Sequence, residues 1–169
     1  MATAHLCLIG LPGVGKSAVA AELATRLDRD VVELDEEIEA LAGRSIPMIF
    51  ELDGEARFRA LECEALSDAL GRGPKSVIST GGGVVTTAQG RTLLADVDCV
   101  WLRADLAVLA ERLLDSPVGR PLLSADLDAD LQALAAERDG LYEQVADLMV
   151  DIGTASPSAI AAQIEIELT

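Results

Sequence analysis

The sequence has no long apolar run, little cysteine and no asparagine. No apolar stretch approaches the roughly 18 residues that a membrane-spanning helix needs, so no membrane partner is expected. The three cysteines are too few and too scattered for a disulfide framework or a zinc site, and Cys7 and Cys99 fall in strand-like runs where buried, reduced thiols are expected. Residues 1–11 have no basic segment ahead of their apolar stretch, which argues against a signal peptide and for a cytoplasmic protein.

Basic residues are also scarce. Thirteen Lys and Arg face 29 Asp and Glu, which gives a formal net charge of −16, and the only lysines are Lys16 and Lys75. A surface of this charge repels nucleic acid and anionic membranes, so neither is an expected partner. An anionic ligand would have to be held by a few local cations and by backbone N–H groups. The acidic surface and the lack of a large exposed apolar helix face favour a monomer.

The remaining composition and the order of elements indicate one α/β domain. The chain has 169 residues, of which 50% are hydrophobic and 25% charged, as expected for a single globular core. Short runs rich in Val, Ile and Leu alternate with helical patterns, which predicts a five-stranded parallel sheet with helices on both faces. The predicted strands cover residues 6–9, 31–34, 76–79, 99–102 and 148–152. The predicted helices cover residues 16–27, 36–70, 88–95, 105–114, 128–145 and 157 onward, with a new start at Ser45 and Pro47, a break at Asp53–Gly54 and an interruption at Gly140.

Two segments depart from this alternation. A helical excursion covers about residues 35–65, and a loop rich in proline and glycine covers about residues 115–126. The loop has the length and composition of a lid that closes over a site. The core of the single domain would then comprise about residues 1–34, 66–114 and 127–169.

Residues 10–17, GLPGVGKS, match the phosphate-binding pattern G-x-x-x-x-G-K-[ST]. A predicted strand precedes the motif and a predicted helix follows it, as that loop requires. The glycines allow successive N–H groups to turn toward an anion, and the helix N-terminus adds its dipole. Lys16 can reach the β- and γ-phosphates, and the Ser17 hydroxyl can bind Mg²⁺. Without asparagine the N-K-x-D guanine signature cannot be present, which favours a small ATP-dependent kinase over a GTPase.

Acidic residues follow the second predicted strand. Glu33 and Asp35 are two residues apart and would share one side of that strand. Parallel α/β sheets bind ligands at the carboxyl ends of their strands. Glu33 could therefore hold a water molecule on Mg²⁺, and Asp35 could orient an acceptor hydroxyl and take its proton. An ordinary solvated strand end explains the same acids equally well.

Further candidate groups lie downstream. Arg59 and Glu62 are three residues apart on a predicted helix and can form an ion pair. Such a pair is often only a surface salt bridge, although it can also hold a guanidinium rigid for binding a carboxylate. The glycine triplet at residues 81–83 removes side chains from the end of the third strand, so that a small ligand can reach the backbone. Arg120 lies in the predicted lid and Arg138 on the long helix after it.

Taken together, these segments resemble the shikimate kinase family over essentially the whole chain. The matching segments are GLPGVGKS at 10–17, GRSIPMIFELDGEARFRALE at 43–62, STGGGVV at 79–85, RPLL at 120–123, RDGLYEQVA at 138–146, and the acid Asp35 with the stretch from Asp151 to Pro157. The phosphate loop is common to many kinases. The arginine–glutamate pair, the glycine triplet and the RPLL segment, in this order and at this spacing, are specific to the family.

The resemblance implies transfer of the γ-phosphoryl group of ATP, with Mg²⁺, to the 3-hydroxyl of shikimate, within a P-loop kinase fold in which residues 35–65 bind the acceptor. It implies catalytic roles for Lys16, Asp35 and the lid residue Arg120. The implied acceptor-binding residues are Asp35, Arg59, Gly81, Gly82, Gly83 and Arg138. The implied nucleotide-binding residues are Gly13, Val14, Gly15, Lys16, Ser17, Ala18, Arg120 and Pro157. Ser17 and, through water, Glu33 would bind the metal.

The sequence departs from the family pattern at three places. Many members have Asp-x-Asp where this chain has Glu33-x-Asp35, and glutamate changes the geometry of a metal contact through water. The family often stacks an arginine on adenine shortly before the lid, and the sequence around Arg112 does not identify that residue. Thr154 to Ser156 are small where larger polar residues are common, which favours weaker or less selective nucleotide binding.

Two other functions compete with this interpretation. A kinase of another polyol or sugar acid, such as gluconate, would keep the phosphate loop, but would need acceptor groups other than Arg59 and Arg138. A nucleotide-binding regulator without turnover would need no intact acceptor set. An adenylate kinase is disfavoured because Ala18 follows Ser17, where Gly-Thr is usual after the lysine.

Overall fold

The computed structural model describes residues 5–73, 75–116 and 122–168. The described residues form a five-stranded, fully parallel sheet in the order β2-β3-β1-β4-β5. The strands are β1 Leu6–Ile9, β2 Asp30–Glu33, β3 Ser76–Ser79, β4 Asp98–Arg103 and β5 Leu148–Asp151. All five predicted strands are confirmed, with β2 beginning and ending one residue earlier than predicted. The sheet order places β1 at the centre, where all four of its residues are buried.

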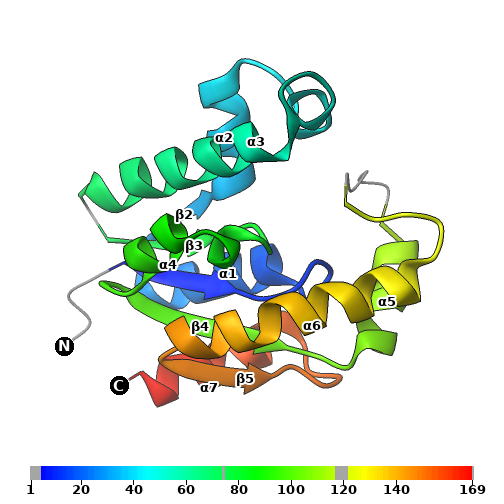
Figure 1. The fold of residues 1–169 in the computed structure, drawn as a ribbon. Helices are drawn as coiled ribbons and strands as arrows, with labels where there is room; N and C mark the ends of the chain where they lie inside the picture. The colour runs from blue at the N-terminus through cyan, green and yellow to red at the C-terminus, as the bar shows by residue number, and fades with distance from the viewer. Residues whose placement is uncertain (1–4, 74, 117–121, 169) are drawn as a thin grey trace.

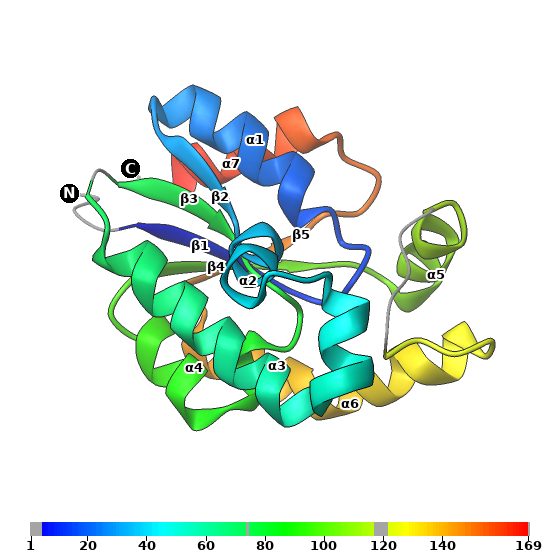
Figure 2. The same cartoon turned by 90° about the horizontal axis from the view of Figure 1, so that it is seen from above.

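Helices cover both faces of the sheet, as the alternating pattern predicts. Figure 2 shows α1 and α7 on one face and α3, α4 and α6 on the other. In the described residues the helices are α1 Lys16–Leu27, α2 Leu34–Ala42, α3 Ile46–Gly71, α4 Ala88–Leu94, α5 Leu106–Leu114, α6 Leu127–Val145 and α7 Pro157–Glu167, with a 3₁₀ turn η1 at Val84–Thr86. Ser156 caps α7 by accepting a hydrogen bond from the Ala159 N–H, as its position before Pro157 predicts.

The excursion predicted at residues 35–65 is formed by α2 and the first half of α3. Both helices rise above the sheet, beyond the carboxyl end of β2 (Figure 1). A kink divides α3 at Gly54, whose φ of 80° and ψ of 172° lie outside the helical region. This backbone conformation suits glycine and confirms the break predicted at Asp53–Gly54. The predicted start near Ser45 is also confirmed, since α3 begins at Ile46.

The predicted interruption at Gly140 is wrong. Residues Leu127–Val145 form one continuous helix, α6, that passes straight through this glycine. A side chain at Gly140 would meet nothing within 4 Å, so the position is open and the helix loses no packing there. An exposed helical glycine costs only about 1 kcal/mol relative to alanine, which packing of a long helix easily offsets.

The cysteines are buried free thiols, as predicted. Cys7 on β1 lies opposite Cys99 on β4, and Cys63 is buried on α3. A hydrogen bond with the Cys99 side chain and burial together raise the pKa of the Cys7 thiol. Within the described ranges, no helix is long and apolar enough to cross a membrane.

Candidate active site

The phosphate loop joins β1 to α1 through three glycines with left-handed φ angles. Gly10 has a φ of 146°, Gly13 of 84° and Gly15 of 94°. L-residues with side chains rarely adopt these angles, and a side chain at Gly10 would also collide with the carbonyl oxygen of Leu102 on β4. These backbone angles therefore explain why glycine occupies the three positions. The loop leads directly into the N-terminus of α1.

The polar side chains of the loop already have protein partners. The Lys16 ammonium donates to the carbonyl oxygens of Gly10 at 2.8 Å and Leu11 at 3.1 Å. The Ser17 hydroxyl donates to Oε2 of Glu33 at 2.9 Å. Glu33 is thus placed beside Ser17, as its predicted part in metal binding requires. Desolvation raises the pKa of Glu33, and its hydrogen bonds with Ser17 and Ser79 partly oppose that shift.

Asp35 does not share a strand side with Glu33, so that prediction is wrong. β2 ends at Glu33, and Leu34 begins α2 with Asp35 in its first turn. The pairing of β2 with β3 ends at Glu33, and an acid in the first turn of the helix that follows is favoured by the helix dipole. Glu33 and Asp35 nevertheless line the same cavity. Asp35 lies near the glycine triplet, with its Oδ1 3.7 Å from the position that a Cβ on Gly81 would take.

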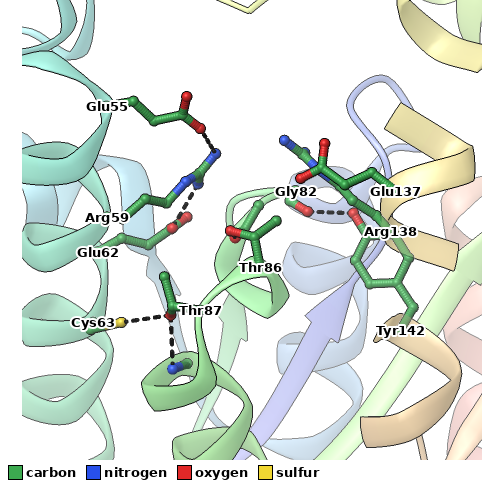
Figure 3. A network of polar contacts seen from close by, with 12 residues as sticks. Glu55, Arg59, Glu62, Cys63, Gly82, Thr86, Thr87, Glu137, Arg138 and Tyr142 are labelled. Carbon is green, nitrogen blue, oxygen red and sulfur yellow. Dashed lines mark hydrogen bonds and ion pairs between the residues drawn. The ribbon is translucent and has the colours of Figure 1, made fainter. Parts of the chain in front are cut away.

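The glycine triplet lies between two arginines and two carboxylates. A Cβ on Gly81 would be 2.5 Å from Oε1 of Glu62, and one on Gly82 would be 3.2 Å from Nη1 of Arg138. A Cβ on Gly83 would overlap the guanidinium of Arg59. Figure 3 shows Arg59 and Arg138 approaching this loop from α3 on one side and α6 on the other. The triplet is therefore needed because charged side chains pack directly against its backbone.

The Arg59–Glu62 pair is buried, which excludes an ordinary surface salt bridge. Arg59 Nη1 donates to Glu62 Oε2 at 2.7 Å, and Nη2 pairs with Glu55 at 3.3 Å. Glu62 is 1% exposed and Arg59 8%. Burial raises the pKa of Glu62, and the charge of Arg59 opposes that shift. The predicted i,i+3 pair is confirmed, and it holds the guanidinium in one orientation.

Arg59, Glu62 and Arg138 form an arginine–carboxylate cluster beside the glycine triplet. Two donors and one acceptor of this cluster have no hydrogen-bond partner among the described residues. They are Nε of Arg59, Nε of Arg138 and Oε1 of Glu62, all of them buried atoms. Arg138 is only 3% exposed, and its nearest carboxylate is Glu137 at 4.0 Å. Buried polar atoms are nearly always hydrogen-bonded in folded proteins. Two guanidiniums that lie against one loop and each keep an unsatisfied buried donor are the pattern expected of a site for an anionic ligand.

One cavity of about 410 Å³ joins the phosphate loop to this cluster. From the phosphate loop and its neighbourhood it is lined by Gly13, Gly15, Lys16, Ser17, Ala18, Glu33 and Arg112. From the acceptor side it is lined by Asp35, Ile46, Phe50, Phe58, Arg59, Glu62, Gly81, Gly82, Gly83 and Arg138. Two predicted nucleotide-binding residues lie outside this lining: Val14, whose side chain is buried in the core, and Pro157, which is exposed at the start of α7. Arg120 lies outside the described residues.

Some of the residues that line the cavity carry no clear signal in the sequence. Glu62 is predicted only as the ion-pair partner of Arg59, and Phe50 and Phe58, whose rings pack 4.6 Å apart from centroid to centroid, are not predicted as site residues. The sequence assigns no binding role to Arg112. In the structure its Nη1 donates to the Val14 carbonyl in the phosphate loop at 3.2 Å. The position of Arg112 on the last turn of a helix directly before the predicted lid was the available signal.

Comparison with known proteins agrees with this geometry. The family model described as shikimate kinase matches residues 12–169. A shikimate kinase of Halorhodospira halophila is 42% identical over 162 residues, which cover 95% of this chain and 90% of that protein. One of Stenotrophomonas maltophilia is 42% identical over 167 residues, covering 97% and 91%.

Solved structures give the same result. The shikimate kinase of Acinetobacter baumannii in complex with shikimate superposes with a TM-score of 0.90 at 30% identity, covering 98% of this chain and 92% of that one. The enzyme of Aquifex aeolicus gives a TM-score of 0.82 at 34% identity, covering 97% and 95%. A sugar kinase of a Janibacter species, at 18% identity and a TM-score of 0.65, shares the fold alone. By its sequence, its fold and the residues gathered in its cleft, the chain belongs to the shikimate kinase family.

Proposed function

We propose that the cleft holds ATP and shikimate side by side and that the protein transfers the γ-phosphoryl group of ATP to the 3-hydroxyl of shikimate. The observation that carries this proposal is the single cavity shared by the phosphate loop and the arginine–carboxylate cluster. In-line phosphoryl transfer requires donor and acceptor to lie within one enclosed site. The similar Acinetobacter enzyme was solved in complex with shikimate, which supports the choice of acceptor.

The nucleotide side consists of the phosphate loop and the N-terminus of α1. Its N–H groups and the helix dipole suit the β- and γ-phosphates. The Lys16 ammonium lies on the carbonyls of Gly10 and Leu11, close to where phosphate oxygens would replace them as stronger partners. Arg112 adds a second cation at the loop. Contacts of Arg120 and Pro157 with the nucleotide remain predictions.

The acceptor side suits a small hydroxylated acid. The two buried guanidiniums of Arg59 and Arg138 match the geometry of a carboxylate, and their unsatisfied Nε donors support that assignment. Asp35 can accept hydrogen bonds from ring hydroxyls. Its role is chiefly to orient the attacking hydroxyl, because phosphoryl transfer depends mainly on positioning and on stabilising charge. The backbone of the glycine triplet closes the floor of the pocket.

The residues near the phosphate loop fit Mg²⁺. Magnesium prefers oxygen ligands and usually takes one or two from the protein, with phosphates and water completing its shell. The Ser17 hydroxyl and the Glu33 carboxylate supply such oxygens 2.9 Å apart. When bound, the ion neutralises phosphate charge, and Ser17 and, through water, Glu33 would hold it.

A spectrophotometric assay that couples ADP release to NADH oxidation tests the proposal. We expect turnover with shikimate, and only background rates with gluconate, with AMP or with no acceptor. Turnover with gluconate in place of shikimate would transfer the assignment to another sugar-acid kinase. Nucleotide binding without turnover on any acceptor would indicate a regulator and contradict the proposal.

A further inference from the structure

Tyr142 is a buried polar residue that the chemistry above does not use. It lies on α6 four residues after Arg138, so the two side chains share one face of the helix. The side chain is 0% exposed, and its ring packs against Trp101 of β4 with centroids 5.6 Å apart. Burial raises the pKa of Tyr142 far above its usual range, so its hydroxyl keeps its proton at any physiological pH.

The Tyr142 hydroxyl joins α6 to the glycine triplet. It donates a hydrogen bond to the Gly82 carbonyl (Figure 3), and the positive charge of Arg138 on the same helix partly opposes the rise in the pKa of Tyr142. Gly82 in turn lies against Arg138, with 3.2 Å between Nη1 and the position of a Gly82 Cβ. The hydroxyl therefore ties α6 to the Gly82 backbone, against which the Arg138 guanidinium packs.

A purely structural role makes a different prediction. If Tyr142 only filled the core, phenylalanine would fill the same space, and the acceptor site would not change. The ring would still pack on Trp101, and only the hydroxyl would be lost. Without it, the Gly82 carbonyl loses a buried hydrogen-bond donor, and the backbone against which Arg138 packs is free to shift.

We propose that Tyr142 is a positioning residue for the acceptor: its hydroxyl fixes Gly82 and Arg138 relative to each other, so that the shikimate carboxylate meets a preorganised guanidinium. The inference rests on the proposed function, because it assigns Arg138 to that carboxylate. It places the effect on acceptor binding and not on nucleotide binding, since Tyr142 donates to Gly82, which packs against Arg138, and both of these residues line the cavity at the glycine triplet.

The first test is the Tyr142→Phe variant, with the Michaelis constants for shikimate and ATP measured separately. We expect the KM for shikimate to rise about tenfold, the size of one lost hydrogen bond to a buried group, with kcat and the KM for ATP within about twofold of wild type. Thr86→Val is the matched control, because Thr86 Oγ1 donates to the Gly83 carbonyl at 2.7 Å in the same loop but, among the described residues, has no hydrogen bond to Arg138 or Tyr142. An unchanged KM for shikimate in Tyr142→Phe, or an equal rise in Thr86→Val, would overturn the proposal.

A double-mutant cycle with Arg138→Ala separates this role from general loosening of the fold. If Tyr142 acts through Arg138, adding Tyr142→Phe to Arg138→Ala should raise the KM for shikimate less than twofold further. Additive effects would contradict the positioning role. An unchanged KM in Arg138→Ala itself, or no turnover of shikimate by the wild type, would instead refute the proposed function and the inference with it.

Discussion

At the scale of single residues, the acceptor site is built from charges that the fold has buried before any ligand arrives. Glu62 lies in the interior, where desolvation raises its pKa, and the positive charge of Arg59 opposes that shift. Such a pair adds little net stability compared with apolar residues, but breaking it leaves an uncompensated buried charge. The pair instead holds the Arg59 guanidinium in one orientation beside the glycine triplet.

Arg59→Ala should raise the KM for shikimate at least tenfold and leave the KM for ATP nearly unchanged, because Arg59 lies on the acceptor side of the cavity. It should also lower the free energy of unfolding by about 3 kcal/mol, since Glu62 loses its partner. Initial-rate kinetics and urea denaturation measure the two effects. Adding Glu62→Gln should restore most of the stability and none of the shikimate binding. A loss of ATP affinity with shikimate affinity intact would reverse the assignment of the two sides.

The raised pKa of Glu33 predicts how the stability of the folded protein changes with pH. Because its folded-state pKa is raised, the stability it contributes is fully present below the unfolded value of about 4.3 and is lost as the pH rises through the folded pKa. Glu33→Gln should therefore raise the melting temperature of the free protein at pH 8, and the difference should vanish near pH 4. Calorimetry at both pH values measures it. An equal difference at the two pH values would show that desolvation of the charge is not the cause.

At the scale of elements, the phosphate loop and the glycine triplet differ in how far sequence predicts them. The loop between β1 and α1 has a motif, a preceding strand and a following helix, so its place and its lysine could be predicted from local sequence. The need for three glycines at residues 81–83 could not be predicted from local sequence. It arises because Arg59 on α3 and Arg138 on α6, which are far apart in the chain, pack against this loop. The position of Asp35 was mispredicted for a similar reason, since the end of β2 is decided by pairing with β3, where Glu33 is the last partner.

Lys16→Ala should lower kcat at least a hundredfold, because the ammonium is the cation of the loop best placed to stabilise charge on the transferred group. The melting temperature should change by less than about 3 °C, since Lys16 lies part-exposed at the start of α1, outside the apolar core, and donates to loop carbonyls. Steady-state kinetics and thermal unfolding check both. Unchanged turnover would refute the phosphate role of Lys16, and a collapse in stability would indicate a structural one.

Gly83→Ala should disable the acceptor site through its backbone. The new methyl group would occupy the place of the Arg59 guanidinium, which must then move, so the KM for shikimate should rise at least tenfold. Gly140→Ala is the matched control: its Cβ meets nothing, and it should stabilise α6 by about 0.5–1 kcal/mol with unchanged kinetics. The measurements are the KM for shikimate and the unfolding midpoint. Wild-type kinetics in Gly83→Ala would show that contact between Arg59 and the triplet is dispensable.

At the scale of the whole molecule, a chain of net charge −16 is proposed to bind two anions in one cleft. Its overall field opposes both, so binding must depend on local cations and backbone dipoles within about one Debye length, ~8 Å at physiological ionic strength. The cleft gathers Lys16, Arg59, Arg112 and Arg138 from four different helices. The sequence predicted the sheet and its order of elements, whereas the spacing of these cations arises only when α3, α5 and α6 pack around the sheet.

The proposed phosphoryl transfer requires both ligands to bind next to each other in that cleft. A crystal structure with ADP and shikimate bound tests it most directly. We predict the ADP phosphates on residues 10–17 and the shikimate carboxylate between Arg59 and Arg138, with its 3-hydroxyl beside Asp35 and directed toward the phosphate loop. Shikimate bound outside the cavity, or with its carboxylate turned away from both arginines, would contradict the account.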